Sequence, residues 1–314
     1  MRLVAECGPL APYLTAPGVT DVFVNGAGGL WVDRGRGLER VEGWRLAESR
    51  LRELAVRLIS LGGRHVDEAT PCVDVRLSGG VRVHAVLPPI SVSGTLISIR
   101  LPSVRRFSLD ELAEAGMFGG DERLLARLRA AVSERTNLLV TGAGGCGKTT
   151  LLAALLGEAP AQERIVAIED VAELGVRHPH FVSLESRQAN LEGSGRIDLE
   201  RLVREALRMR PDRLVLGECR GEEVRDLLAA LNTGHDGGAG TLHANSLWDV
   251  PARLEALGAL AGMGPDAVAR QTVSAIGLVL HLERIDGARR LAQVGRFAVD
   301  TAGRLTIEAE EDSG

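Results

Sequence analysis

The stretch TGAGGCGKTT occupies residues 141–150 and contains Lys148, the only lysine of the chain; arginine supplies the other long basic side chains. Arginine ends in a planar fork, whereas lysine carries a compact charge on a thin, flexible stem. A narrow backbone loop wrapped around phosphate groups has room for the lysine and not for the fork. The stretch also fits the pattern G-x-x-x-x-G-K-[ST], whose glycine-rich backbone cradles phosphates. It therefore predicts a P-loop.

The sequence around this stretch alternates between strand and helix patterns. The apolar run NLLVT (137–141) precedes the glycines and TTLLAALLG (149–157) follows them, so the loop joins a strand to a helix. RIVAIED (164–170) and RLVLGE (213–218) predict two more buried strands, with an amphipathic helix between them. Such alternation is typical of a mainly parallel sheet with crossover helices. We expect an α/β P-loop domain over residues 121–314.

The first part of the chain follows another pattern. Short strand patterns separated by glycine-rich turns lie between residues 20 and 45, and a helix pattern at 47–62 ends at a glycine pair. Three later runs alternate apolar and polar residues, as half-buried antiparallel strands do: CVDVRL (72–77), VRVHAV (81–86) and TLISIR (95–100). We expect a smaller α+β domain over residues 1–105 and a linker at 106–120.

Composition narrows the class of protein. A hydrophobic content of 45% and a charged content of 25% are typical of a globular protein in water. The net charge of −5 and the aromatic content of 3% argue against a nucleic-acid partner. The four cysteines form no C-x-x-C pair, and no basic start precedes an apolar signal segment. We therefore expect a cytoplasmic protein with reduced cysteines.

The glycine-rich stretch predicts the contacts to a nucleotide. Backbone N–H groups of the loop and the helix N-terminus bind phosphate, and Lys148 is expected to reach the β- and γ-phosphates. The Thr149 hydroxyl is expected to bind Mg²⁺. The predicted nucleotide contacts in this segment are Gly142, Ala143, Gly144, Gly145, Cys146, Gly147, Lys148, Thr149 and Thr150.

Acidic residues end two of the predicted strands. In open parallel sheets, ligands bind at the carboxyl ends of the strands, where Glu169, Asp170 and Glu218 are expected. Glu218 is the candidate for holding Mg²⁺ and for orienting or deprotonating the attacking water. Glu169 is a second candidate for catalysis, and Asp170 and Glu173 are open between chemistry and the capping of a helix.

The segment NTGHDGGAGTLHANS (232–246) places two histidines among four glycines. A zinc site would need a further ligand at a suitable spacing, and none accompanies His235 and His243. Close to the P-loop, His243 could sense a terminal phosphate or donate a proton, with His235 beside the nucleotide. Ordinary polar loop residues are the alternative. The remaining histidines are interpreted as surface or core residues: His65, His84, His178, His180 and His281.

The order of these segments resembles that of the type II/IV secretion ATPase superfamily, most closely its tight-adherence (Flp-type) pilus assembly ATPases. GAGGCGKTT resembles the family's Walker A motif and RIVAIEDVAEL its Asp box. RMRPDRLVLGECRG resembles its atypical Walker B motif and NTGHDGGAGTLHANS its His box. The likeness implies a RecA-like P-loop domain that uses ATP and Mg²⁺.

The resemblance also implies a mode of action. Arginines of the N-terminal domain approach the γ-phosphate in this family, often across a subunit boundary, and Arg82 and Arg100 match them, with Arg76 a weaker match. Family members form homohexamers that act on a polytopic inner-membrane platform protein and, through it, on pilin subunits, from the inner face of the cytoplasmic membrane. The expected function is an ATP-hydrolysing motor. A nucleotide-gated scaffold with little turnover and a DNA translocase are the alternatives.

Overall fold

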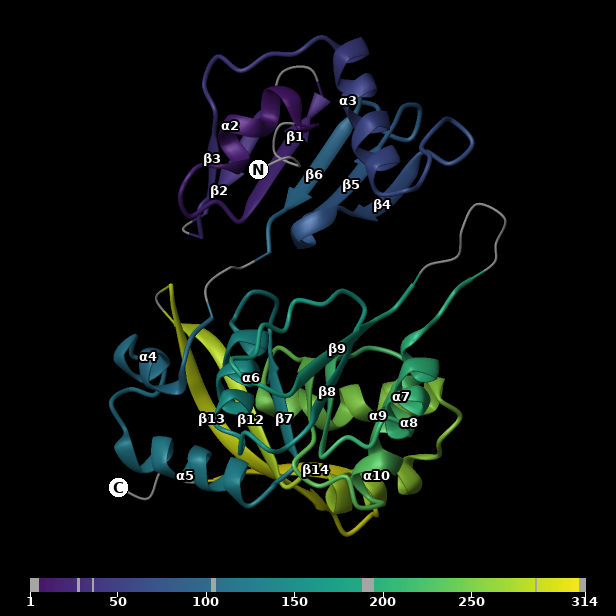
Figure 1. Cartoon of the computed structure of the whole chain (residues 1–314). Helices are drawn as coiled ribbons and strands as arrows, with labels where there is room; N and C mark the ends of the chain where they lie inside the picture. The colour runs from purple at the N-terminus through teal and green to yellow at the C-terminus, as the bar shows by residue number, and fades with distance from the viewer. Residues whose placement is uncertain are drawn as a thin grey trace. The chain divides into compact units, whose positions relative to one another are not determined.

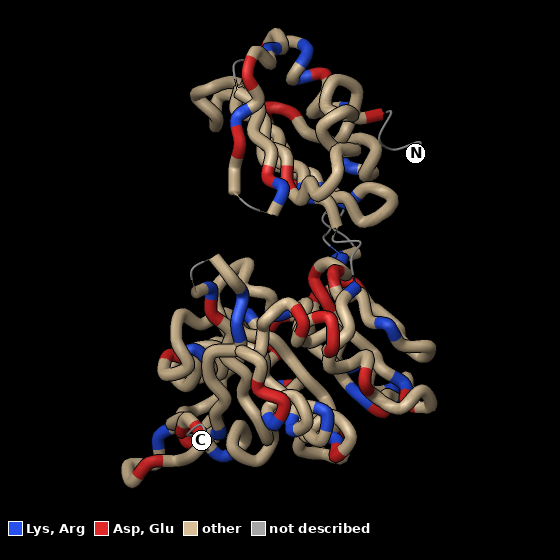
Figure 2. The backbone as a smooth tube through the Cα atoms, turned by 90° about the vertical axis from the view of Figure 1, so that its left-hand side faces the viewer, with Lys and Arg blue, Asp and Glu red and all other residues tan. Residues whose placement is uncertain are grey.

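The computed structural model of the chain describes residues 6–26, 29–35, 37–102, 106–187, 195–285 and 287–310. These residues form two compact units, of which the first ends at residue 102 and the second begins at residue 106 (Figure 1). Blue and red segments alternate along the described backbone of both units in Figure 2, so the basic residues do not gather into one stripe. Within the described ranges, no helix combines the length and apolar character that crossing a membrane requires.

The first unit contains a six-stranded antiparallel sheet with the strand order β3-β2-β1-β6-β5-β4. α3 (Glu48–Leu61) packs its buried leucines against strand residues such as Val22 and Ile99. The three alternating runs of the sequence form the last three strands, as expected. The other elements of this unit are η1 (Gly8–Leu10), α2 (Ala11–Leu14), β1 (Asp21–Asn25), β2 (Leu30–Asp33), β3 (Leu38–Arg40), β4 (Cys72–Arg76), η3 (Ser78–Gly80), β5 (Arg82–Val86) and β6 (Leu96–Arg100).

The second unit contains an eight-stranded sheet with the order β14-β13-β12-β7-β11-β10-β8-β9. Neighbours from β12 to β9 pair in parallel, while β13 and β14 pair antiparallel. The expected α/β class is confirmed, and the two antiparallel strands make the sheet mixed. Its strands are β7 (Leu138–Gly142), β8 (Ile165–Glu169), β9 (Phe181–Glu185), β10 (Arg213–Cys219), β11 (Ala239–His243), β12 (Leu278–Ile285), β13 (Ala288–Val299) and β14 (Leu305–Ala309).

Helices cover both faces of this sheet. Two apolar cores result, one between the sheet and the first helices of the unit and one between the sheet and the later helices. The first face carries α4 (Leu109–Glu114), α5 (Glu122–Ser133) and α6 (Lys148–Gly157). The second carries α7 (Leu199–Leu207), α8 (Glu223–Leu231), α9 (Val250–Leu260) and α10 (Pro265–Ala275), with η4 (Leu247–Asp249) before α9.

The segment expected to be a linker, residues 106–120, packs on the second unit instead. A capping box joins Ser108 and Glu111 and starts α4. Leu109, Leu112 and Met117 are buried in the same core as the leucines of α6. The capping box and the i, i+3 spacing of the two leucines explain why this stretch forms a packed helix.

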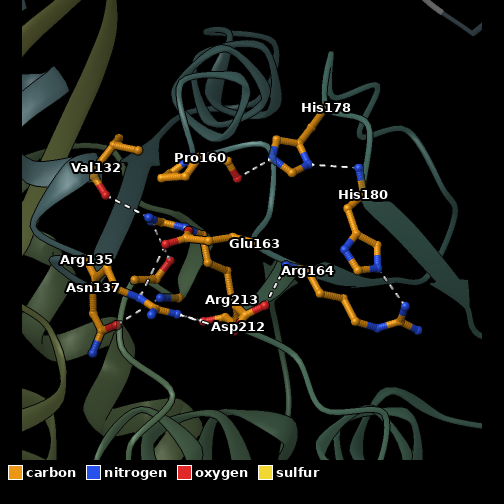
Figure 3. Close-up of polar contacts among 12 residues, drawn as sticks. Val132, Arg135, Asn137, Pro160, Glu163, Arg164, His178, His180, Asp212 and Arg213 are labelled. Carbon is orange, nitrogen blue, oxygen red and sulfur yellow. Dashed lines mark hydrogen bonds and ion pairs between the residues drawn. The ribbon is translucent and has the colours of Figure 1, made fainter.

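A polar network joins the amino ends of the parallel strands (Figure 3). The Arg213 side chain is only 2% exposed and forms an ion pair with Glu163. Its guanidinium also donates to the carbonyl oxygens of Val132, at 2.8 Å, and Gly237, at 3.3 Å. Asn137 donates to Ala275 O and accepts from Gly238 N. The network connects α5, β10 and the start of β11 at the edge of the sheet opposite the P-loop.

Candidate nucleotide site

The P-loop runs from the end of β7 to the start of α6. Gly142, Gly145 and Gly147 have φ values of 141°, 73° and 102°, which side chains other than glycine rarely adopt. A Cβ atom at Gly142 would lie 2.3 Å from the carbonyl oxygen of Leu282. These positions therefore need glycine, and a glycine-rich loop at the N-terminus of a helix is suited to bind phosphate.

Lys148 begins α6 and is 7% exposed. Its ammonium group donates to the carbonyl oxygens of Gly142 and Ala143, each at 2.9 Å, and lies 3.3 Å from His243 Nδ1. An ammonium has three N–H donors, so all three have partners within the chain. Burial lowers the pKa of Lys148, against the opposing charges of Cys146 and Glu218.

His243 ends β11 and lies opposite Gly142 in the register of the neighbouring strand β7. Its Nε2 atom lies 3.4 Å from Glu218 Oε1. Burial, and then the charge of Lys148, lower the pKa of His243, whereas Glu218 raises it. The Lys148 ammonium lies beside Nδ1 and the Glu218 carboxylate faces Nε2, which fits a neutral ring with its proton on Nε2.

The two candidate catalytic carboxylates, Glu218 and Glu169, lie on β10 and β8, the strands that follow β11 in the sheet order. Glu218 lies near the end of β10 and is 45% exposed beside His243. Glu169 ends β8 and is 4% exposed; its Oε1 accepts from the N–H groups of Glu173, at 3.0 Å, and Leu174, at 2.9 Å. Burial raises the pKa of Glu169. Glu218 is thus the carboxylate that faces the P-loop residues, while Glu169 holds the loop that follows its own strand.

Asp170 and Glu173 take part in the same loop. Asp170 forms an ion pair with Arg220 and accepts from Ser186 Oγ at 3.0 Å. Glu173 contributes its N–H to Glu169. These contacts join the loops after β8 and β10.

The structure does not bring His235 to the P-loop of its own chain. His235 precedes β11, and its Nδ1 contacts Ala230 O, near the end of α8, at 3.2 Å. Gly238, three residues later, pairs with Asn137 and Leu138 at the start of β7. The length of β11 therefore separates His235 from His243, and the expected nucleotide contact of His235 is not supported.

Arg82 and Arg100 belong to the first unit, where they lie opposite each other on β5 and β6. Arg76 lies opposite Arg82 on the other side, and Arg100 Nε bonds to Asp21 Oδ1 at 2.9 Å. Three arginines thus share one row of the sheet, although like charges directly opposite each other are unfavourable.

Sequence reasoning missed two contacts. Arg289 of β13 donates from Nε to Gly145 O at 3.1 Å, and Arg253 of α9 donates to His243 O at 3.3 Å. Neither arginine lies in one of the four motifs. Both reach the site from elements, α9 and β13, whose packing beside the P-loop could not be predicted from the sequence. The four motif segments themselves do meet: β7, β11, β10 and β8 are successive neighbours in the sheet, and their carboxyl ends form the site.

Comparison with known proteins identifies the family. The chain belongs to the type II/IV secretion system protein family, whose model matches residues 4–297. It is 50% identical over 294 residues to a Mycobacterium tuberculosis protein whose name assigns it provisionally to conjugal transfer, covering 91% of this chain and 83% of that protein. It is 36% identical over 263 residues to the type IV secretion system protein PtlH of Bordetella pertussis, covering 76% of each. The expected resemblance to the secretion ATPase superfamily is confirmed.

Solved structures agree with this assignment. The VirB11 ATPase of the Brucella suis type IV secretion system, solved with sulphate, is 26% identical, with a TM-score of 0.50 over 94% of this chain and 98% of that one. The pilus retraction motor PilT, solved with ADP, is 19% identical, with a TM-score of 0.62 over 98% of this chain and 83% of that one. The second match concerns the fold alone.

Proposed function

We propose that this protein is an ATPase motor that hydrolyses ATP to power a secretion or pilus-assembly machine. The observation that carries the proposal is the buried Lys148 in its glycine cradle, with His243 and Glu218 at the ends of the two adjacent strands. Membership of the secretion ATPase family supports nucleotide binding and an ATPase activity.

The residues divide the chemistry between them. The loop N–H groups and Lys148 would hold the phosphates, and Thr149, with Glu218, would hold Mg²⁺, which neutralises phosphate charge when bound. Glu218 would orient and deprotonate the attacking water. His243, which contacts both Lys148 and Glu218, would respond to the terminal phosphate.

The proposal also covers the oligomeric state of the protein and its partners. We propose a homohexamer of the Flp-type class at the inner face of the cytoplasmic membrane, acting on a polytopic platform protein and through it on pilin subunits. The names of the Bordetella and Brucella relatives, which belong to type IV secretion systems, support a membrane machine as the partner. Arg82 and Arg100 are proposed as arginine fingers. The proposed domain layout is an N-terminal domain over residues 1–105 and a RecA-like P-loop domain over 121–314, on which residues 106–120 pack.

Replacing Lys148 tests the function. Lys148→Ala is expected to abolish ATP turnover and weaken MgATP binding at least about tenfold, because the only ammonium in the cradle is lost. Calorimetry measures the affinity, and phosphate release measures turnover. Arg270→Ala, which removes one positive charge from an exposed position on α10, is the control. Near-normal affinity and turnover in Lys148→Ala would contradict the proposal.

The name of the Mycobacterium relative favours a DNA translocase as the second candidate function. Adding single-stranded DNA to the turnover assay separates the two. A DNA translocase is expected to be stimulated by DNA, whereas a secretion motor is expected to be stimulated by the cytoplasmic part of its membrane partner.

A further inference from the structure

Glu218 lies on a β-bulge near the end of β10. β10 and β11 pair in parallel, but their register shifts between Leu216 and Cys219. As a result, Gly217 and Glu218 lie opposite the single β11 residue Thr241. A bulge leaves one residue outside the regular ladder and re-aims its side chain. The direction of the Glu218 carboxylate therefore depends on how this bulge is held.

Thr241 holds the bulge from the neighbouring strand. Its side chain is 2% exposed, and its hydroxyl donates to the carbonyl oxygen of Gly217 at 2.6 Å. Gly217 also leaves room for the Glu169 side chain of the neighbouring strand β8, because a Cβ atom at Gly217 would lie 2.6 Å from Glu169 Cγ. The peptide that leads into Glu218 is therefore fixed by a buried hydroxyl.

Glu223 holds the backbone on the other side of Glu218. This residue is 6% exposed, and its Oε1 accepts from the N–H groups of Arg220, at 2.7 Å, and Gly221, at 2.8 Å. The chain before and after Glu218 is thus held by two buried side chains. Glu218 itself stays half exposed and points at His243, with 3.4 Å between Oε1 and Nε2.

We propose that Thr241 is a positioning residue for ATP hydrolysis, whose hydroxyl sets the bulge so that the Glu218 carboxylate faces His243 and the phosphate cradle. The proposal rests on the proposed ATPase function. Thr241 acts through Glu218, so its loss should slow the chemical step and leave nucleotide binding intact. Glu223 supports the same bulge from the following loop.

The test compares variants that keep the shape of the side chain and differ in the hydroxyl. Thr241→Val is expected to slow single-turnover ATP hydrolysis roughly tenfold to a hundredfold, the scale of a small misplacement of a catalytic group, with an unchanged affinity for MgADP. Thr241→Ser keeps the hydroxyl and is expected to restore most of the rate. Thr272→Val is the matched control, because Thr272 is fully buried in α10 and its hydroxyl has no hydrogen-bond partner among the described residues.

A double-mutant cycle asks whether Thr241 acts through Glu218. In a Glu218→Gln background, Thr241→Val is expected to cause no further loss of rate. An equal loss in both backgrounds, or a normal rate in Thr241→Val alone, overturns the proposal. Melting temperatures are measured for each variant, and Thr241→Ala takes the place of the valine variant if the latter is unfolded at the assay temperature. A wild-type protein that hydrolyses no ATP overturns the proposed function instead, so the two failures are distinct.

Discussion

At the scale of single residues, the central arrangement is the chain Lys148–His243–Glu218. His243 accepts a bond from the ammonium through Nδ1 and faces the carboxylate through Nε2. The carbonyl oxygens of Gly142 and Ala143 use the other two donors of Lys148. A phosphate group that binds Lys148 therefore has to replace partners already present. We therefore propose that His243 influences how tightly nucleotide is held.

His243→Ala is expected to bind MgADP more tightly, by about tenfold, because a hydrogen bond to a charged group no longer competes for Lys148. Turnover is expected to fall, since the residue that links Lys148 to Glu218 is gone. Calorimetry and phosphate release measure the two effects. His235→Ala is the control, because His235 precedes the opposite end of β11 and contacts α8. Weaker MgADP binding by His243→Ala would contradict the competition.

At the scale of elements, the network at the amino edge of the sheet ties strand starts to helix ends. Arg213 of β10 bonds to Val132 at the end of α5 and to Gly237 before β11. Its charge is balanced by Glu163, which precedes β8 (Figure 3). Both side chains are largely buried, and Arg213 has no other acidic partner among the described residues, whereas Glu163 also lies 3.8 Å from Arg135 Nε.

Glu163→Ala is expected to lower the free energy of unfolding of the second unit by about 3–5 kcal/mol, the cost of a buried charge left unpaired. Urea unfolding followed by circular dichroism measures the change. Adding Arg213→Met to the Glu163→Ala variant removes the unpaired positive charge and is expected to restore much of the lost free energy of unfolding. A change below about 1 kcal/mol in Glu163→Ala would mean that the ion pair is solvated.

Strand patterns and motif order predicted which elements bring Lys148, Glu218 and His243 together. The apolar runs at 137–141 and 213–218 predicted the strand before the P-loop and the strand that carries Glu218, and carboxyl ends of parallel strands meet at one edge. The strand β11, which ends in His243, was not predicted, because its glycines indicated a loop. The bulge at Gly217 was not predictable, because it depends on a hydroxyl 24 residues away in sequence. The distance of His235 from the P-loop of its own chain was not predictable for a related reason: the glycines after it lead into a strand that carries the chain across the sheet.

At the scale of the whole molecule, the proposed reaction uses residues of both units. Lys148, His243 and Glu218 belong to the second unit, and Arg82 and Arg100 belong to the first. Arg76, Arg82 and Arg100 form one row on β4, β5 and β6, in which Arg100 also bonds to Asp21, and we propose that this row acts on an anion. We propose that this anion is the nucleotide of a neighbouring subunit.

Mixing two inactive variants tests this arrangement. Lys148→Ala and the double variant Arg82→Ala, Arg100→Ala are each expected to be inactive alone. A mixed ring contains some interfaces with an intact P-loop on one side and intact arginines on the other, so partial recovery of turnover is expected. Native mass spectrometry establishes that mixed rings form. Mixed rings without any recovery would mean that the arginines do not act across subunits.

The place of β7 in the sheet has a consequence for synthesis of the chain. β7 lies between β11 and β12, and both follow it far along the chain, at Ala239–His243 and Leu278–Ile285. As the chain leaves the ribosome, β7 has neither neighbour until most of the second unit has been made, and open strand edges favour aggregation. Both edges of β7 are therefore covered only after β11 and β12 have been made, well after the P-loop that follows β7.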